Sequence, residues 1–250
     1  MSLSLAIGEA FLFINFLFYY SIYFLTCMHS MKPQEDTFRH KGLRKKLIEI
    51  VREQGITDEA VLHAMNNIPR HFFMDSALDN IAYEDRAFPI SDGQTISQPY
   101  TVAYQSQLLQ VKKHDKILEI GTGSIYQATV LAELGAKVFT IERQKNLFDK
   151  TKYFVLKQKY PNIKFFYGDG FLGLPTYAPF DKIIITAAAP YLPPKLLEQL
   201  KVGGTMVIPI DEGENQTMKR ITKLKNDSFS EEIFNKFNFV PMLEGKNNTL

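Results

Sequence analysis

Two glycines and one carboxylate near the middle of the chain have the types and spacing that a nucleoside-binding site requires. Gly121 and Gly123 permit a tight turn and the close approach of a ligand, because neither carries a Cβ atom. The N–H groups of such a turn are available to a ligand. Glu142, further along the chain, can accept hydrogen bonds from both hydroxyls of a ribose. These residues favour a site for a nucleoside-containing cofactor.

The segments around these residues have the patterns of a βαβ unit. The apolar run 117–120 predicts a buried strand that ends at the turn, and 126–134 predicts a helix that Gly135 ends. A second strand is expected over 138–141, and Glu142 follows it. A dinucleotide site would require a third glycine where Tyr126 stands, so a nicotinamide-dependent dehydrogenase is a weak alternative.

Composition limits the other classes of protein. A chain of 250 residues with 45% apolar residues suits one α/β domain plus an appendage. The net charge of +2 gives no electrostatic reason to expect nucleic acid as a partner. The single cysteine, Cys27, excludes an internal disulfide, and the five histidines lack the spacing of a zinc site, so no metal is expected.

The N-terminal segment has two interpretations. Residues 10–28 carry no charge and are long enough for one bilayer crossing, and the basic residues after it would hold the rest of the chain in the cytoplasm. Alternatively, translation starts at Met28 or Met31 and the chain has no anchor. We therefore expect an apolar segment over 1–31 and a single cytoplasmic domain over 32–250, with contact to a membrane through 10–28 only.

Flanking segments predict further elements of this domain. Thr57 is expected to cap a helix, after a first helix that ends near 54. Strands are expected over 164–167, 183–186 and 205–210. Two closing strands are expected over 218–224 and 234–242, with a polar turn over 227–232 between them.

A second informative stretch lies over 90–100. Gly93 permits a turn, and Pro99 restricts Gln98 to an extended conformation just before a helix expected over 101–109. Thr95 and Ser97 stand between amide side chains. A helix cap needs only one hydroxyl, so this run has more polar groups than a cap requires.

This run carries a specific resemblance. Gly93-Gln-Thr-Ile-Ser-Gln-Pro-Tyr100, followed by Leu118-Glu-Ile-Gly-Thr-Gly-Ser124, is similar to the protein-L-isoaspartate O-methyltransferase family of S-adenosylmethionine-dependent enzymes. The similarity extends from about 36 to about 246 and includes Phe239-Val-Pro-Met242. It implies a doubly wound, Rossmann-like α/β sheet that is mostly parallel and has an antiparallel C-terminal edge.

The resemblance also implies an activity and its residues. The family transfers a methyl group from S-adenosylmethionine to the free α-carboxylate of L-isoaspartyl residues in damaged proteins and peptides, and the ester then collapses to a succinimide that hydrolyses partly to aspartate. The resemblance implies that Ser97 is the active-site serine, whose hydroxyl orients the carboxylate or the reacting end of the cofactor. We also expect the enzyme to be a monomer. The implied cofactor-binding residues are Gln94, Thr95, Ile96, Glu119, Gly121, Thr122, Gly123, Glu142, Asp169 and Gly170. Asp169 follows the strand 164–167 and is expected to accept a hydrogen bond from the adenine amino group.

The chemistry of this reaction agrees with the residues present. An α-carboxylate ordinarily has a pKa of about 3.5 and is already ionised at neutral pH, so no general base is needed. Alignment of the reacting groups can supply roughly 7–11 kcal/mol of the barrier. The lack of an obvious nucleophile in the sequence is therefore compatible with the function.

One position departs from the family pattern. Ile125 stands where the family has the third glycine of the turn, so it either fills cofactor space or imposes strain if its φ is positive. The sequence thus predicts weaker cofactor binding than in an Ile125→Gly variant. Two alternatives stay open: a catalytically weakened, membrane-tethered module that binds S-adenosylmethionine, and a methyltransferase for RNA or a small molecule. The second of these does not account for the run 94–99.

Overall fold

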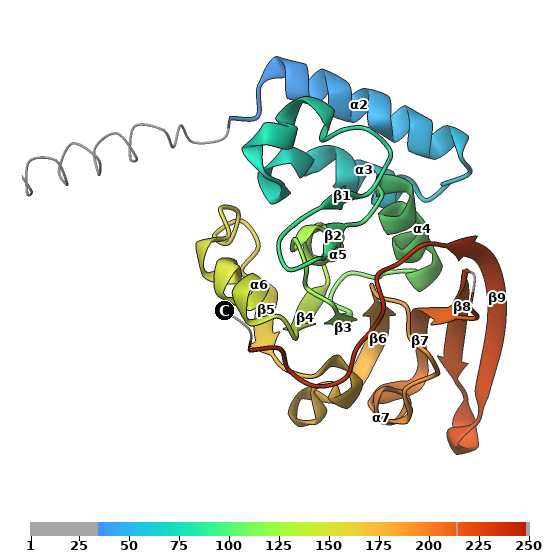
Figure 1. Ribbon diagram of the computed structural model, residues 1–250. Helices are drawn as coiled ribbons and strands as arrows, with labels where there is room; N and C mark the ends of the chain where they lie inside the picture. Colours follow the sequence, from blue (N-terminus) through green and yellow to red (C-terminus); the bar gives the residue numbers. More distant parts are fainter. Residues whose placement is uncertain (1–34, 214, 249–250) are drawn as a thin grey trace, which may run out of the picture. The chain divides into compact units, whose positions relative to one another are not determined.

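The computed structural model of the protein describes residues 35–213 and 215–248. Contacts divide the chain into two units, Met1–Thr37 and Phe38–Leu250, and the labelled elements of Figure 1 belong to the second. The stretch 10–28, for which the sequence predicts a membrane span, lies outside the described residues. Among the residues described, no helix combines the length and the apolar character needed to cross a bilayer.

A sheet of seven strands lies at the centre of the described part of this unit, in the order β5-β4-β3-β6-β7-β8-β9. Its parallel strands are β3 (Lys116–Ile120), β4 (Lys137–Glu142), β5 (Ile163–Tyr167), β6 (Phe180–Ile185) and β7 (Leu200–Asp211). Two antiparallel strands, β8 (Gln216–Lys223) and β9 (Phe229–Phe237), complete one edge. The predicted sheet, mostly parallel with an antiparallel C-terminal edge, is confirmed.

The central strands are apolar along most of their length because both faces of the sheet are covered. In β6, Ile183, Ile184 and Ile185 are all fully buried, as expected for a parallel strand between two layers of helices. From β3 the chain winds outward through β4 to β5, and it then returns to β6 on the other side of β3. This reversal opens a crevice at the carboxyl ends of β3 and β6, where open α/β sheets bind their ligands.

Helices cover both faces of the sheet. On one face α4 (Pro99–Leu109) and α5 (Tyr126–Glu133) pack against the strands, and α2 (Phe38–Glu53) and α3 (Glu59–Asn67) form an outer layer over them (Figure 1). The other face is covered by α7 (Pro194–Glu198) and by short 3-10 turns. The remaining short elements are η1 (Arg70–Phe73), η2 (Ser76–Ile81), β1 (Phe88–Pro89), β2 (Thr95–Ile96), α6 (Lys145–Lys150), η3 (Thr151–Tyr153), η4 (Gly170–Leu172), η5 (Pro175–Tyr177) and η6 (Lys225–Asp227).

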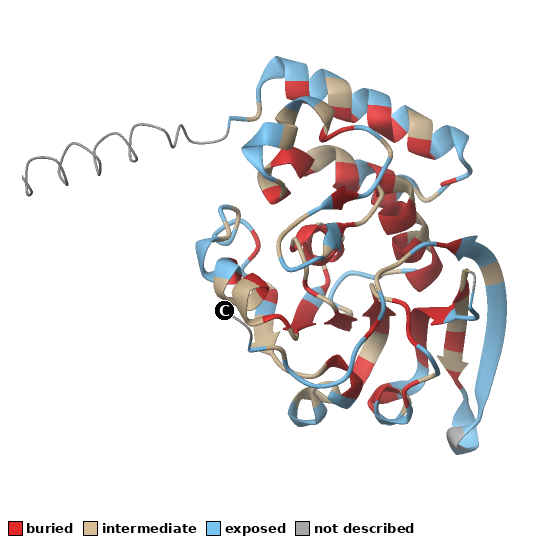
Figure 2. Ribbon diagram, in the orientation of Figure 1, coloured by how far each residue is buried: buried red, intermediate tan, exposed pale blue. Residues whose placement is uncertain are grey.

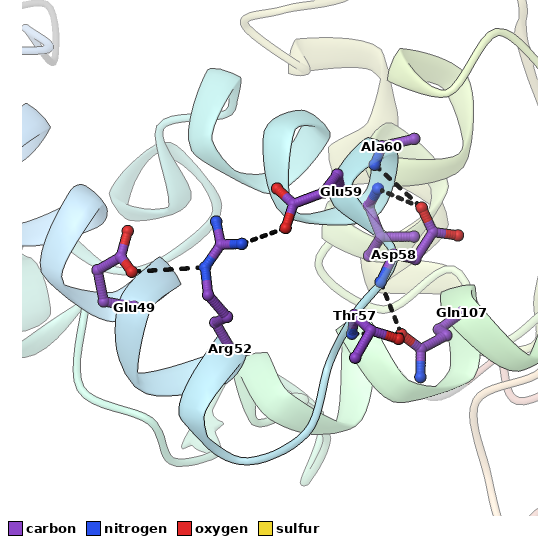
Figure 3. A network of polar contacts seen from close by, with 8 residues as sticks. Glu49, Arg52, Thr57, Asp58, Glu59, Ala60 and Gln107 are labelled. Atoms are coloured by element: carbon purple, nitrogen blue, oxygen red, sulfur yellow. Dashed lines mark hydrogen bonds and ion pairs between the residues drawn. The ribbon is translucent and has the colours of Figure 1, made fainter.

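The start of α3 differs from the prediction. Asp58, not Thr57, is the N-cap, and its carboxylate accepts hydrogen bonds from the N–H groups of Ala60 at 3.0 Å and Val61 at 3.2 Å (Figure 3). Thr57 precedes the cap, and its N–H donates to Oε1 of Gln107 at 2.8 Å. The cap thus lies one residue after the predicted position, and Gln107 of α4 binds the backbone just before it.

The C-terminal edge also differs in detail. The segment 227–232, which the sequence predicts as a turn, contributes most of its residues to β9, and β9 ends before the predicted 242. Its polar residues pair across the strands, with Glu231 at 2.8 Å from Lys219 and Glu232 at 2.6 Å from Arg220. Figure 2 shows that β9 is exposed along most of its length, which explains why its residues resemble those of a turn.

Candidate active site

The glycine turn after β3 has the backbone geometry that its sequence predicts. Gly121 and Gly123 have φ angles of 97° and 49°, in the left-handed region that favours glycine. A Cβ atom on Gly121 would lie 2.5 Å from Oγ1 of Thr186, which is too close for any side chain. Only glycine fits at this point, and the bare backbone there forms one wall of a cavity.

Glu142 holds this turn from the end of β4. Its Oε2 accepts a hydrogen bond from the N–H of Gly123 at 2.9 Å, and its Oε1 accepts one from the N–H of Gln144 at 2.8 Å. Burial raises the pKa of the Glu142 carboxyl, and these backbone hydrogen bonds oppose the rise. Each carboxylate oxygen retains a further lone pair, so Glu142 can accept additional hydrogen bonds from a ligand.

The run 94–98 lies across the crevice from the glycine turn. Asp85 fixes its end, because Oδ1 accepts from the N–H of Tyr100 at 2.8 Å and Oδ2 accepts from Nε2 of Gln98 at 2.9 Å. Gln98 is the N-cap position of α4, and Pro99 begins the helix. The Ser97 side chain is half-buried, and among the described residues its hydroxyl makes no hydrogen bond.

Two neighbouring cavities meet at this run. The first, here called the turn cavity, lies between the glycine turn, the run 94–97 and the segment 240–243. The second, here called the α4 groove, lies between the start of α4 and the end of β9. Four residues line both cavities, namely Thr95, Ser97, Thr186 and Val240. Ser97 therefore stands at the junction of the turn cavity and the α4 groove.

Most of the residues predicted for the site come together in the turn cavity. Those that line it are Gln94, Thr95, Ile96, Ser97, Gly121, Thr122, Gly123, Glu142 and Gly170. Two others do not line it. Glu119 is fully buried within the sheet, and Asp169 uses Oδ1 for the N–H of Phe171 and Oδ2 for the N–H of Gly245, both at 2.9 Å.

The carboxyl group of Glu119 is chemically unusual. Neither of its oxygens has a hydrogen-bond partner among the described residues, and its side chain has no exposure to solvent. Burial raises its pKa to about 8, the charge of Glu142 acts in the same direction, and Thr140 opposes the rise. Glu119 is therefore protonated at neutral pH.

Ile125 adopts the strained conformation that the sequence raised as one of two possibilities. Its φ is 74°, which is rare for a β-branched residue. Its side chain is 7% exposed and does not line the turn cavity. It lines a third cavity on the other side of the turn, together with Phe73 and Phe154. The possibility that Ile125 fills the turn cavity is thus excluded for this structure, and strain is what it contributes.

Several residues that line the turn cavity were not among the site residues expected from the sequence. Tyr126 and Gln127 begin α5, Thr186 follows β6, and the segment 240–243 returns from β9 across the strand ends (Figure 1). Backbone pairing between Ala188 and Pro241 holds this segment there. The phrase 239–242 was informative only through its resemblance to a family, because nothing in its local chemistry predicts a cavity wall.

Comparison with known proteins agrees with this geometry. The family model for protein-L-isoaspartate(D-aspartate) O-methyltransferase matches residues 42–247. The protein-L-isoaspartate O-methyltransferases of Christiangramia forsetii and Flavobacterium johnsoniae are 54% and 53% identical to the chain, and in each case the match covers 85% of this chain and 100% of the relative.

Solved structures give the same result. A protein-L-isoaspartate O-methyltransferase superposes with a TM-score of 0.73 and 26% identity, covering 82% of this chain and 67% of the other. A protein of Plasmodium falciparum described as a putative protein-L-isoaspartate O-methyltransferase, solved in complex with S-adenosyl-L-homocysteine, superposes with a TM-score of 0.70 and 26% identity, covering 80% and 98%. The extent of these matches, together with the glycine turn and the Ser97 run, establishes that the chain belongs to the protein-L-isoaspartate(D-aspartate) O-methyltransferase family.

Proposed function

We propose that this protein methylates the free α-carboxylate of L-isoaspartyl residues in damaged proteins and peptides, with S-adenosylmethionine as the methyl donor, and so initiates their repair to aspartate. The observation that carries the proposal is the position of Ser97 where the turn cavity meets the α4 groove. A donor in the cavity and a peptide in the groove would meet at this residue.

The turn cavity has features that suit an adenosyl cofactor. At Gly121 the backbone is bare, since a Cβ there would collide with Thr186. Glu142 keeps acceptor capacity beside the turn after binding the N–H groups of Gly123 and Gln144. We assign Glu142 to the ribose hydroxyls and the turn 121–123 to the methionine part of the cofactor. Gln94, Thr95 and Ile96 would cover the cofactor from the opposite wall.

The two predicted residues outside the lining have different proposed roles. Asp169 accepts a hydrogen bond from the N–H of Phe171, directly after Gly170, which does line the cavity, and its carboxylate keeps lone pairs for the adenine amino group. Glu119 acts beneath the turn, where its neutral carboxyl group leaves no negative charge next to Glu142. These assignments make Asp169 a direct ligand and Glu119 a support.

The reaction requires alignment and no proton transfer. When bound, S-adenosylmethionine supplies an activated methyl group, and a C–O bond forms to the carboxylate as the S–C bond breaks. The Ser97 hydroxyl, which has no partner among the described residues, donates a hydrogen bond that orients the carboxylate. The half-buried position of Ser97 removes part of the water that would otherwise solvate this charge.

The proposal extends to the setting of the enzyme. We propose that the active form is a monomer in the cytoplasm. Its partners are isoaspartyl-containing proteins and peptides. With a net charge of +2 the chain has no general attraction for nucleic acid.

The decisive experiment compares two peptides that differ only in one linkage. We expect transfer of labelled methyl groups to an isoaspartyl peptide and none to its aspartyl twin. Ser97→Ala should lower kcat/KM for the isoaspartyl peptide by about 10- to 100-fold, the worth of a hydrogen bond to a charged group, with little change in S-adenosylhomocysteine affinity.

Ser91→Ala is the matched control, because Ser91 lies in the same loop but lines neither the turn cavity nor the α4 groove. It should retain wild-type activity. Intact cofactor binding without any methyl incorporation would instead support the alternative of a binding module without catalysis.

A further inference from the structure

A fully buried arginine connects the two walls of the active site. Arg70, the first residue of η1, has no exposure to solvent. Its Nη2 donates to the carbonyl oxygen of Ser97 at 2.9 Å, and its guanidinium lies 4.9 Å from the centroid of the Tyr126 ring. Ser97 belongs to the run before α4 and Tyr126 begins α5, and both line the turn cavity. Arg70 itself lines neither the turn cavity nor the α4 groove.

The burial of this cation has an energetic cost that packing alone does not explain. A buried charge loses its hydration, and apolar residues of similar volume often stabilise a core better. Nε of Arg70 donates to the carbonyl of Ala82 at 3.1 Å, but Nη1 has no hydrogen-bond partner among the described residues. Burial lowers the pKa of Arg70 to about 10, so the guanidinium is still charged at neutral pH.

The hydrogen bond to Ser97 determines how the next peptide group is oriented. The Ser97–Gln98 peptide is trans and planar, so its N–H points away from the carbonyl that Arg70 holds. The N–H of Gln98 makes no backbone hydrogen bond within the described part of the chain, and Gln98 lines the α4 groove. Pro99, the following residue, has no N–H. Gln98 therefore offers a backbone donor next to the Ser97 hydroxyl.

We propose that Arg70 is a positioning residue for the methyl acceptor: by holding the Ser97 carbonyl against α5, it directs the Ser97 hydroxyl and the Gln98 N–H together into the α4 groove, where they bind the two oxygens of the substrate carboxylate. This inference rests on the proposed function. Arg70 touches neither substrate nor cofactor. Its effect passes through the Ser97–Gln98 peptide.

The test uses Arg70→Lys and Arg70→Met in the full chain. Lysine keeps the charge but cannot bind the Ser97 carbonyl, the Ala82 carbonyl and the Tyr126 ring at once, and methionine removes the charge at similar length. We expect kcat/KM for an isoaspartyl peptide to fall by about 10- to 100-fold in Arg70→Lys and further in Arg70→Met. The affinity for S-adenosylhomocysteine, measured by calorimetry, should change less than about threefold, the effect of a weak indirect contact.

Arg44 supplies the matched control. It is also a buried arginine, with Nε at 2.6 Å from the carbonyl of Asn66 and Nη1 at 3.0 Å from the Tyr83 hydroxyl, and neither partner lines the turn cavity or the α4 groove. Arg44→Met should lower the melting temperature without the selective loss of acceptor kcat/KM. An equal loss in Arg44→Met and Arg70→Met at matched stability would overturn the proposal.

A second readout does not depend on methyl transfer. Amide hydrogen exchange over 95–98 should become faster in Arg70→Lys and stay unchanged in Arg44→Met, because Arg70 binds the Ser97 carbonyl within this run and Arg44 binds partners outside it. Unchanged exchange in Arg70→Lys contradicts the positioning role whatever the activity. A wild-type protein that does not methylate isoaspartyl peptide would refute the proposed function, and the exchange result would still decide the role of Arg70.

Discussion

At the scale of single residues, Ile125 is the clearest case of a side chain that costs stability at a functional turn. Its left-handed conformation is one that glycine adopts freely, and an L-residue with a Cβ pays about 1–2 kcal/mol for it. Its side chain is nevertheless buried beside Phe73 and Phe154, and that burial offsets part of the strain. At the start of α5, the apolar contacts of Ile125 therefore compensate in part for its unfavourable backbone conformation.

The strain can be measured by a pair of variants. Ile125→Gly should be more stable than Ile125→Ala by about 1–2 kcal/mol in denaturant unfolding, because both remove the apolar contact but only glycine removes the strain. Equal stabilities would contradict this explanation. From the sequence we expect Ile125→Gly to bind S-adenosylhomocysteine more tightly than wild type, and calorimetry on the same preparation tests this. Equal affinities would show that Ile125 affects stability and not cofactor binding.

Glu119 leads to a prediction about pH. Its pKa is about 8 in the folded protein and its ordinary value is 4.5, so between these values the folded state binds more protons than the unfolded state. Its contribution to stability is therefore present at low pH and is lost as pH rises from 4.5 to about 8.

Glu119→Gln should remove this dependence. We expect the variant to gain stability relative to wild type as pH rises from about 5 to about 8.5, by an amount on the order of a few kcal/mol. Melting temperatures measured across this range provide the test. Glu53→Gln, at an exposed position of α2, is the control. If the melting temperatures of wild type and Glu119→Gln change in parallel with pH, Glu119 is not a buried neutral carboxyl group.

At the scale of elements, the turn between α2 and α3 shows how a helix end is fixed from outside. In Figure 3 the Asp58 carboxylate accepts hydrogen bonds from N–H groups in the first turn of α3. The side-chain oxygen of Gln107, in α4, accepts hydrogen bonds from the N–H groups of Thr57 and Asp58. Arg52 at the end of α2 pairs with Glu59 in α3 and with Glu49. The outer helical layer is thus joined to α4, whose first turn follows Ser97.

Removal of the cap should cost about 1 kcal/mol. Asp58→Ala leaves the N–H groups of Ala60 and Val61 without an acceptor, which lowers the free energy of unfolding by that amount in chemical denaturation. Thr57→Ala is the control, because Thr57 contributes its backbone N–H rather than its side chain to the best of its contacts with Gln107. Equal losses in the two variants would contradict Asp58 as the cap.

Element boundaries were predictable where local chemistry sets them. The runs 117–120 and 138–141 became β3 and β4 because continuous apolar residues suit a strand covered on both faces. The prediction was wrong for 227–232, because pairing of Glu231 and Glu232 with basic residues of β8 stabilises a strand there. Such cross-strand pairs depend on the register between β8 and β9, which no local pattern contains.

At the scale of the whole molecule, the strand order creates the site. The chain reverses direction across the sheet between β5 and β6, so the carboxyl ends of β3 and β6 open a crevice beside the glycine turn. The segment 240–243 closes one wall, and the run 94–97 closes another. Ligand binding should therefore stabilise several distant segments together.

This coupling predicts a thermal shift. S-adenosylhomocysteine at about 100 times its dissociation constant should add about 2.7 kcal/mol to stability and raise the melting temperature by roughly 5 to 10 °C. NADH should produce no comparable shift, because Tyr126 stands where a dinucleotide site needs glycine. A shift with NADH and none with S-adenosylhomocysteine would reverse the assignment of the turn cavity.

Local chemistry was readable from the amino-acid sequence alone. Gly121, Gly123 and Glu142 could be assigned to one site because a turn without Cβ atoms and an acid at a strand end form a short, recognisable pattern. The run 94–97 was assigned to the same site through its resemblance to the family. The mostly parallel sheet with its antiparallel edge followed from the family resemblance of the same residues and is confirmed.

Other features required the folded chain. The direction in which Ile125 points, the neutral state of Glu119 and the bond from Arg70 to the Ser97 carbonyl all depend on residues far away in sequence. Burial and hydrogen bonding at these positions are properties of packing between elements, and the amino acids at a single stretch do not contain them. For this reason the site could be located from local patterns and the family resemblance, while its electrostatics and internal supports were decided by tertiary contacts.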